Sequence, residues 1–340
     1  MNPRISVVAL GLSAAIGFAG CQKVQELEPE PLKLAVPDHF PDPIFGTGET
    51  APTAAGFELG RRLFYDPGLS VDGTISCGSC HAQVHAFADH NVALSTGVGG
   101  ALGTRNSPAL SNLAWYPTFM ADGGITHLEV MPLAPLMSPV EMAADSEHLM
   151  SYLKTHPVYP RLFQNAFGGE PTGQRLLKAL AQFQAMLVSA NASYDQWALG
   201  QIDFTDTEQR GYDLFVAHCS TCHTEPLFTD FSYANTGLDS VSADAGRYRV
   251  TLDPLDHGAF KVPNLRNVAL TRPYMHDGRL FTLRSVVDHY ADGVIVHPGL
   301  DERLPGPLGL DEQQREDLVA FLETLTDYEY LANSQISEPR

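Results

Sequence analysis

Two short stretches of the sequence carry the same pattern of two thiols and an imidazole, C-x-x-C-H. One lies in "TISCGSCHAQ", residues 74–83, and the other in "HCSTCHTE", which begins at His218. The residues concerned are Cys77, Cys80 and His81 in the first stretch, and Cys219, Cys222 and His223 in the second.

In C-x-x-C-H the two thiols can add to the two vinyl groups of a haem, and the adjacent histidine then ligates the iron. A zinc site made from both cysteine pairs is one alternative. Zinc-binding pairs are usually separated by about 15 to 20 residues, far fewer than lie between Cys80 and Cys219. Zinc, like a thioredoxin-type redox pair, would also leave both histidines unexplained. The motifs therefore predict two covalently bound c-type haems, with His81 and His223 as iron ligands.

The start of the chain has the pattern of an export signal. Residues 5–20 are apolar and follow a short segment containing Arg4, as in secretory signals that are removed. The run ends in "FAGC", which resembles a bacterial lipobox with Cys21 as the acylated residue; an ordinary signal peptide is the alternative. Lipid on Cys21 would anchor a periplasmic protein to a membrane, and we expect the outer membrane.

Cysteine use and charge limit the other roles of the chain. Cys21 is assigned to lipid and the other four cysteines to haem, so none of the five is left for a disulfide. The chain has 21 Lys and Arg against 40 Asp and Glu, a formal net charge of −19. Such a surface repels nucleic acid and attracts basic partners, unless it serves only to keep the protein soluble. We expect no nucleic-acid partner.

The apolar residues follow helical rather than strand-like spacing. Residues 54–66 and 206–219 read as helices that lead into the two motifs. Residues 172–190 form another amphipathic segment, and residues 310–327 carry an apolar stripe behind Asp311, a candidate helix cap. We predict a mainly α protein with two cytochrome c-type domains, each around one covalent haem.

The predicted organisation has four parts along the chain. Residues 1–20 are the lipoprotein signal peptide, and residues 21–44, rich in Pro and Glu, are a flexible tether. Residues 45–195 form an N-terminal haem domain and residues 196–340 a C-terminal haem domain. The boundary is expected within "NASYDQWALGQIDFTD".

Short motifs around the haem sites resemble those of the bacterial dihaem cytochrome c peroxidase and MauG superfamily. They are "RNSPALSN" (105–112), "FMADGG" (119–124), "SPVEM" (138–142), "VPNLRNVALTRPYMHDG" (262–278) and "TLRSVVDHYADG" (282–293). Each is weak by itself, but their order and spacing are specific, and the resemblance covers residues 45–330. It implies that the N-terminal haem cleaves peroxide and that the C-terminal haem transfers electrons.

The resemblance implies that Glu141 of "SPVEM" is the acid/base group above the peroxide-cleaving haem. Peroxide cleavage requires a proton to move from the inner oxygen to the leaving oxygen. Burial in this apolar stretch would raise the pKa of Glu141 and suit it to that task. The alternative is an ordinary solvated surface carboxylate.

In classical members of the family a loop histidine closes this haem in the resting enzyme. The resemblance places that position at Val98, which cannot ligate iron. We therefore expect an open haem that needs no reductive activation. His85 and His90 lie nearby in the sequence and are the alternative ligands.

At the second haem the resemblance implies Tyr290 as the other iron ligand, counted from His276 of "MHDG". Classical peroxidases have methionine at this position and MauG has tyrosine. A tyrosine that only packs in an amphipathic helix is the alternative. An anionic phenolate ligand would favour the ferric state and give this haem a low reduction potential.

The resemblance also implies a structural Ca²⁺ between the haems. Asn106 would supply a side-chain oxygen, and Thr271 and Pro273 would supply carbonyl oxygens; ordinary turn chemistry is the alternative. The chain departs from the family at Ala121, where an inter-haem tryptophan is usual, and at Met131, where a distal glutamine is usual. The first change removes the usual electron bridge, and the second replaces a hydrogen-bonding group with a thioether.

Together these features predict a cytochrome-c peroxidase-type oxidoreductase that reduces hydrogen peroxide. Its electrons would come from a small periplasmic donor such as a cytochrome c or a cupredoxin. One alternative is a MauG-like dihaem oxidase that uses peroxide to modify a residue of a partner protein, which Val98 and Tyr290 favour. Another is a non-catalytic electron-transfer cytochrome, which Glu141 and an open haem argue against. Formation of a homodimer is left open.

Overall fold

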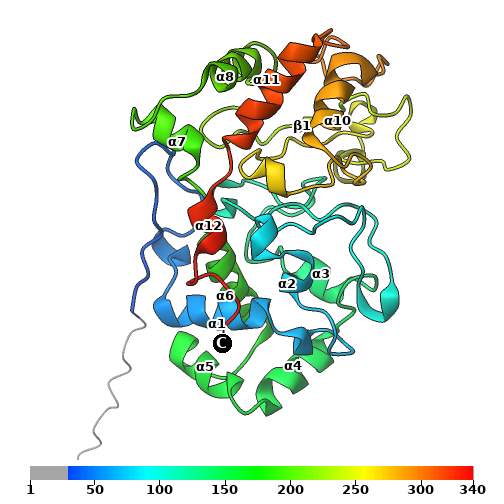
Figure 1. The fold of residues 1–340 in the computed structure, drawn as a ribbon. Coiled ribbons are helices and arrows are strands. Elements are labelled where there is room, and N and C mark those ends of the chain that lie inside the picture. Colours follow the sequence, from blue (N-terminus) through cyan, green and yellow to red (C-terminus); the bar gives the residue numbers. More distant parts are fainter. Residues whose placement is uncertain (1–29, 340) are drawn as a thin grey trace, which may run out of the picture.

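The computed structural model describes residues 30–339, and Figure 1 shows their arrangement. The predicted signal peptide, Cys21 and the first residues of the predicted tether lie outside the described residues. Among the described residues, no helix has both the length and the apolar character needed to cross a bilayer.

The described chain consists mainly of short helices joined by turns. The α-helices are α1 (Ala54–Phe64), α2 (Cys77–Cys80), α3 (Leu133–Met137), α4 (Ser146–Thr155), α5 (Tyr159–Phe167), α6 (Gly173–Ala185), α7 (Ser193–Ala198), α8 (Asp206–His218), α9 (Tyr248–Thr251), α10 (Leu283–Asp288), α11 (Glu312–Glu323) and α12 (Tyr328–Ala332). Two short strands, β1 (Tyr233–Ala234) and β2 (Phe260–Lys261), pair in the antiparallel direction.

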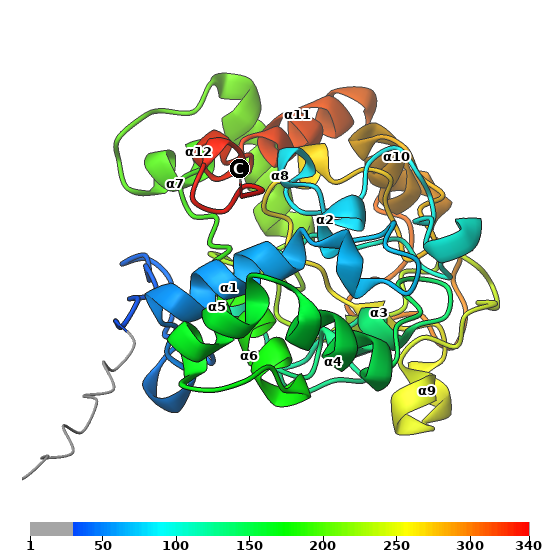
Figure 2. The same cartoon turned by 90° about the horizontal axis from the view of Figure 1, so that it is seen from below.

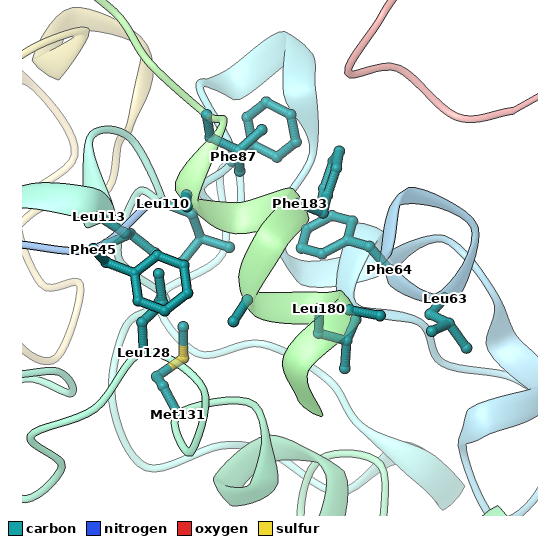
Figure 3. Close-up of a cluster of buried hydrophobic side chains, with 14 of the residues drawn as sticks. Phe45, Leu63, Phe64, Phe87, Leu110, Leu113, Leu128, Met131, Leu180 and Phe183 are labelled. Atoms are coloured by element: carbon teal, nitrogen blue, oxygen red, sulfur yellow. The ribbon is translucent and has the colours of Figure 1, made fainter. Parts of the chain in front are cut away.

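The N-terminal domain is built on the crossing of α1 and α6, with α4 and α5 packed beside them (Figure 2). The two central helices approach closely at Gly60, where a Cβ atom would lie 1.9 Å from the carbonyl oxygen of Ala179. Phe64 and Phe183 are fully buried beside this crossing (Figure 3). The crossing fixes the direction in which α1 leads the chain toward the first motif.

The C-terminal domain repeats this design with α8 and α11. A Cβ atom on Gly211 of α8 would lie 2.0 Å from the carbonyl oxygen of Asp317 in α11. Phe215 and Phe321 are fully buried at the crossing, and α10 packs against α11. In each domain a helix held by a second helix leads into a C-x-x-C-H motif, so the predicted mainly α fold with two cytochrome c-type domains is confirmed.

Part of the predicted tether is packed against the globular protein. Leu34 and Phe40 are buried in the core of the N-terminal domain. The indole Nε1 of Trp115 donates a hydrogen bond to the carbonyl oxygen of Pro41 at 2.7 Å. This differs from the expectation of a free tether up to residue 44. The physical reason is that the few apolar side chains between the prolines find an adjacent core to bury themselves in.

Segments near the ends of both predicted domains pack into the core of the other domain. Figure 1 shows α12 below α11, and beyond it the carbonyl oxygen of Ile336 accepts a hydrogen bond from the hydroxyl of Tyr65, the residue after α1, at 2.9 Å. Tyr330 of α12 and Ile336 are buried in the core of the N-terminal domain. Conversely, Tyr194 of α7 belongs to the core of the C-terminal domain. The last residues of the chain therefore fasten the C-terminal half to the N-terminal domain.

The two domains meet through ion pairs and backbone hydrogen bonds. Arg105 pairs with Asp122 at 2.7 Å and with Asp244 of the C-terminal half at 2.6 Å. The backbone amide of Lys261 in β2 donates to the carbonyl oxygen of Ala121 at 2.8 Å. These contacts hold the segment at residues 105–122, which follows the first motif, against the segment at residues 244–261, which follows the second.

Candidate active site

The first motif is a single capped helical turn. Cys77 and Cys80 are the first and last residues of α2. At the start of this helix the backbone amide of Ser76 donates a hydrogen bond to the hydroxyl oxygen of Ser79 at 3.0 Å. The amide of His81 donates to the carbonyl oxygen of Cys77 at 2.9 Å. Residues three apart on a helix share one face, so both thiols point to the same side, and neither is in a disulfide.

The orientation of His81 is set by a backbone carbonyl. Its Nδ1 lies 2.8 Å from the carbonyl oxygen of Phe87. A carbonyl oxygen can only accept, so Nδ1 carries the proton and Nε2 keeps a free lone pair, the tautomer that binds a metal through Nε2. Burial lowers the pKa of His81, which favours the neutral imidazole that a metal requires.

The second motif lies in the turn that follows α8. Cys219 caps the C-terminus of α8, and the amide of Cys222 donates to its carbonyl oxygen at 3.2 Å. Nδ1 of His223 lies 3.0 Å from the carbonyl oxygen of Phe228 and 3.1 Å from that of Pro263. Burial lowers the pKa of His223 as well, so it too is a neutral imidazole with a free Nε2.

Both donor sets fit a covalently attached haem. Each offers two free thiols one helical turn apart and an imidazole whose Nε2 is free to bind iron. Within residues 30–339, no group of three or more His, Cys, Asp and Glu side chains is placed to hold a metal ion. The two cysteine pairs are therefore not gathered into one four-cysteine site, which removes the zinc alternative.

Glu141 lies close to the first motif, in the turn that follows α3. Burial raises the pKa of the Cys77 thiol to about 12, and the charges of Cys80 and Glu141 act in the same direction. Burial also raises the pKa of Glu141, against a hydrogen bond from Ser138. The structure thus brings a half-buried carboxyl group with a raised pKa into the neighbourhood of the two thiols.

The loop that contains Val98 is packed against the backbone of Glu141. The amide of Val98 donates to the carbonyl oxygen of Glu141 at 2.8 Å. A Cβ atom on Gly97 would lie 2.2 Å from the carbonyl oxygen of Val140, so only glycine allows this approach. The loop has the apolar side chain of Val98 at the position where the resemblance implies a histidine ligand in classical members of the family.

The two alternative ligands, His85 and His90, stack on each other. Their ring centroids are 3.6 Å apart with an interplanar angle of 6°. Burial lowers the pKa of His85, with His90 and Arg272 adding to the effect. Whether either imidazole ever reaches the haem stays a prediction.

Tyr290 lies in a π-helical turn, His289–Gly293, that continues α10. Such turns are rare in proteins, and many of those that do occur lie at functional sites. Burial raises the pKa of the Tyr290 phenol, and the charges of Cys219 and Cys222 raise it further. The structure therefore places the phenol near the second thiol pair, and ligation of the second haem by Tyr290 stays a prediction.

The residues expected to bind Ca²⁺ lie in one neighbourhood at the domain joint. The amide of Asn106 donates to the carbonyl oxygen of His276 at 2.8 Å, and its side-chain nitrogen donates to that of Ala93 at 3.1 Å. Thr271 and Pro273 lie in the segment that precedes His276. Calcium binding stays a prediction.

The two departures from the family have different surroundings. Met131 is buried in the core of the N-terminal domain, beside Leu128 in Figure 3. Ala121 contacts β2 through its carbonyl oxygen, and in β2 the ring of Phe260 stacks on His276 with centroids 4.0 Å apart. A phenylalanine and a histidine thus lie next to the position where the family has its tryptophan.

Lys261 is a half-buried lysine at the domain joint that sequence reasoning missed. Burial lowers its pKa to about 7, and the nearby charge of Arg247 lowers it further. Its ammonium donates to the carbonyl oxygen of Thr118 and lies 5.4 Å from the ring centroid of Tyr116. No local pattern marks this lysine, because its surroundings come from segments far apart in the chain.

Two family models match successive parts of the chain. The family model described as "Di-haem cytochrome c peroxidase" matches residues 54–203, and the model described as "Cytochrome c" matches residues 208–326. The chain is 40% identical over 274 residues to the methylamine utilization protein MauG of Methylorubrum extorquens, covering 78% of this chain and 77% of that protein. It is 32% identical to the cytochrome c551 peroxidase of Nitrosomonas europaea, covering 95% and 90%.

Solved structures show the same similarity. The crystal structure of a MauG-like protein associated with microbial copper homeostasis matches with a TM-score of 0.82 and 32% identity, over 90% of this chain and 98% of that one. The dihaem peroxidase BthA of Burkholderia thailandensis matches with a TM-score of 0.71 over 85% and 91%, and its 24% identity supports a common fold.

Proposed function

The chain belongs to the superfamily of dihaem cytochrome c peroxidases and MauG proteins, and from this premise we propose that it uses hydrogen peroxide to oxidise a partner protein in the periplasm. It is an oxidoreductase of the peroxidase type with two c-type haems. Cys77, Cys80 and His81 would hold one haem, and Cys219, Cys222 and His223 the other. When bound, the haems supply the redox chemistry that splits the peroxide bond.

The observation that carries the peroxide chemistry is the position of Glu141. Its half-buried carboxyl group lies near the first thiol pair and has a raised pKa. Such a group can accept a proton from one peroxide oxygen and deliver it to the other, which then leaves as water. Each H₂O₂ takes up two electrons and two protons and yields two molecules of water. Val98 supports this role because its side chain offers no ligand that would block the site.

Tyr290 favours the oxidation of a residue of a partner protein over the transfer of electrons from a small redox protein such as a cytochrome c. Its half-buried phenol lies near Cys219 and Cys222, where an anionic oxygen would stabilise ferric iron and lower the reduction potential. A haem of low potential accepts electrons poorly from a high-potential donor. The oxidised form of such a haem is better stabilised. It would therefore persist long enough to oxidise a residue of a partner protein slowly. The 40% identical relative named MauG supports the same assignment.

Peroxide reduction with a small periplasmic donor is the second candidate. Relatives named cytochrome c peroxidase support it. The formal net charge of −19 would also attract a basic donor such as a cytochrome c and increase the rate of encounter.

One experiment separates the two candidates. Purified holoprotein is mixed with H₂O₂, with or without a reduced basic cytochrome c, and haem spectra are followed over time. Oxidation of a partner protein predicts a long-lived spectral change and slow cytochrome oxidation. A donor-dependent peroxidase predicts rapid cytochrome oxidation over many turnovers. Absence of any spectral response to H₂O₂ would overturn both.

We also propose that Cys21 is acylated and anchors the protein to a membrane facing the periplasm. The "FAGC" sequence supports this assignment. Cell fractionation and mass spectrometry of the N-terminal peptide test it. Wild type is expected in the membrane fraction with lipid on Cys21, and Cys21→Ala in the soluble periplasmic fraction. An unmodified Cys21 in a soluble wild type would contradict it.

A Ca²⁺ ion at Asn106, Thr271 and Pro273 is proposed as well. Their common neighbourhood at the domain joint and the oxygen donors they offer support it. Metal analysis of protein purified without added calcium should find the ion, and a chelator should lower thermal stability in wild type more than in Asn106→Ala. An equal effect of the chelator on both proteins would count against this site.

A further inference from the structure

We propose that the face formed by α7, the loop at residues 199–205 and the first turn of α8 is the docking surface of the redox partner and the entry point of its electrons. The inference rests on the proposed function, because it requires a protein that supplies electrons. We call this face the α7–α8 face. Figures 1 and 2 both show it at the outer edge of the C-terminal domain.

A chain of aromatic contacts joins this face to the second motif. The ring centroid of Trp197, a half-buried residue of α7, lies 6.0 Å from that of Tyr194 and 4.8 Å from that of Tyr212. The ring of Tyr194 meets that of Phe228 edge-on at 4.7 Å. The carbonyl oxygen of Phe228 accepts the hydrogen bond from His223. Packed atoms therefore run from the surface to the iron-binding imidazole.

Stacking and hydrogen bonds hold the rings of this series of aromatic contacts in place. Trp197 stacks on Phe204 with centroids 4.4 Å apart and an interplanar angle of 3°. In α7, the buried carboxylate of Asp195 accepts two hydrogen bonds from the guanidinium of Arg266, at 2.7 and 2.8 Å. The hydroxyl of Tyr194 donates to the carboxylate of Glu225. Fixed ring positions suit electron transfer, whose rate falls steeply with every added gap.

The surface around Trp197 suits a basic protein with an apolar centre. Leu199 is 53% exposed and Ile202 is 39% exposed. Asp203 and Asp206 are exposed in the same loop and at the start of α8. Interfaces commonly combine an apolar centre with a polar rim, and complementary charge guides the encounter. An apolar patch with an acidic rim is therefore complementary to a patch with a basic rim.

The electron balance follows from the peroxide reaction. The partner would lose two electrons, one at a time, and the contacts from Trp197 would carry each of them toward His223 and the haem that it would hold. One H₂O₂ consumes both electrons together with two protons from solvent and gives two molecules of water. The partner leaves oxidised by two electrons, and where the donor is a cytochrome c, two cytochrome molecules leave oxidised by one electron each.

Charge reversal tests the docking surface. The holoprotein variants Asp203→Lys and Glu170→Lys are compared with reduced basic cytochrome c as the probe. Glu170 is an exposed carboxylate of the N-terminal domain, so both variants change the net charge equally. We expect Asp203→Lys to raise KM about tenfold at low salt, with a difference that shrinks as salt is added. Equal KM values for the two variants would overturn the docking surface.

Removal of the ring tests the path. Trp197→Ala is compared with Leu199→Ala, which shortens a side chain of the same face outside the aromatic chain. We expect Trp197→Ala to lower the limiting rate of cytochrome oxidation about tenfold at saturating cytochrome, whereas Leu199→Ala changes mainly KM. This division follows because KM reports uniform binding and the limiting rate reports the step itself. An unchanged limiting rate in a folded Trp197→Ala protein would overturn the path.

The reaction of each variant with H₂O₂ alone separates the two levels of the proposal. Wild type, Asp203→Lys and Trp197→Ala should give the same spectral response without cytochrome. If wild type itself fails to respond to H₂O₂, the proposed function fails. If all respond equally and no variant affects cytochrome oxidation, only the docking surface and path fail.

Discussion

At the scale of single residues, backbone carbonyls decide which nitrogen of each motif histidine can bind iron. The carbonyl of Phe87 holds Nδ1 of His81, and those of Phe228 and Pro263 hold Nδ1 of His223. In each case Nε2 is left with its lone pair. A backbone acceptor tolerates changes of side chain, so the tautomer does not depend on any one side chain nearby.

Glu141→Gln tests the proton transfer at the first haem. The substitution keeps the size of the side chain but removes its ability to exchange a proton. We expect a rate of peroxide cleavage roughly 10² lower, the usual scale for a positioned acid/base group, with both haems still attached. Rapid-mixing spectroscopy measures it. Glu147→Gln, an exposed carboxylate of α4, is the matched control, and equal rates for both variants would exclude Glu141.

Tyr290→Phe and Tyr290→Met test the second ligand. Phenylalanine keeps the packing and removes the ligating oxygen, so the low-spin signal of this haem should change while the fold survives. Methionine supplies a neutral thioether, which stabilises ferrous iron relative to an anionic oxygen and should raise the potential. Redox titration measures this. Equal potentials and unaltered spectra in all three proteins would make Tyr290 a packing residue only.

At the scale of elements, the loop around Val98 and the π-helical turn around Tyr290 shape the two sites. The loop is tied to Glu141 by one backbone hydrogen bond and by the close approach of Gly97. The turn interrupts the regular helix after α10 and brings Tyr290 to the second thiol pair. Each element thus positions one residue of the proposed chemistry.

Gly97→Ala should disturb the loop. A Cβ atom 2.2 Å from the carbonyl oxygen of Val140 forces the backbones apart and should cost about 1–3 kcal/mol of stability, as overpacking usually does. Thermal unfolding measures the loss. Gly103→Ala is the control, since a Cβ atom there would have its nearest neighbour at 3.6 Å. Equal unfolding temperatures in the two variants would show that the loop yields freely.

The same loop carries a prediction about the spin state of the first haem. Because Val98 offers no ligand, the fully ferric protein should contain one high-spin and one low-spin haem and should react with H₂O₂ without prior reduction. Electron paramagnetic resonance measures the spin states. Val98→His should restore a blocking ligand and convert the high-spin signal to low spin. Two low-spin haems in wild type would mean that another side chain, such as His85 or His90, closes the site.

At the scale of the whole molecule, buried charges and crossing chain ends hold the domains together. Arg266 and Asp195 form a fully buried ion pair, to which His39 adds a hydrogen bond at 2.9 Å. The packed part of the tether, which carries His39, thereby reaches α7, while α12 returns to the N-terminal domain. A fixed arrangement of the two domains fixes the distance between the two haem motifs.

Asp244→Asn tests the joint through its dependence on pH. The hydrogen bond from Arg105 holds the pKa of Asp244 at about 2, against the effect of burial, compared with about 3.9 in an unfolded chain. A lowered folded pKa stabilises the protein above about pH 4, and this contribution is lost as the pH falls toward 2. The unfolding temperature of Asp244→Asn should therefore fall less steeply over this range than that of wild type.

The control for this test is Asp42→Asn, which changes an exposed aspartate of the tether. It should follow wild type across the acid range. If Asp244→Asn also follows wild type, the ion pair with Arg105 contributes nothing to the joint.

The sequence by itself determined the residues of the haem motifs, the family and the helical architecture. Attachment and iron ligation depend on neighbours in the chain: one helical turn separates Cys77 from Cys80, and His81 follows directly. Helical periodicity is equally local. Glu141 and Tyr290 could be named only through the resemblance, because nothing in their immediate sequence distinguishes them from a surface carboxylate and a core tyrosine.

Only the tertiary structure decided which distant segments meet. The carbonyl of Pro263 at His223, the packing of residues 34–40 and the return of α12 all join residues that are remote in the chain. The aromatic path from Trp197 to Phe228 is of the same kind. Such contacts depend on how whole helices pack and on which apolar side chains find a shared core. A pattern confined to a few neighbouring residues carries no information about that packing.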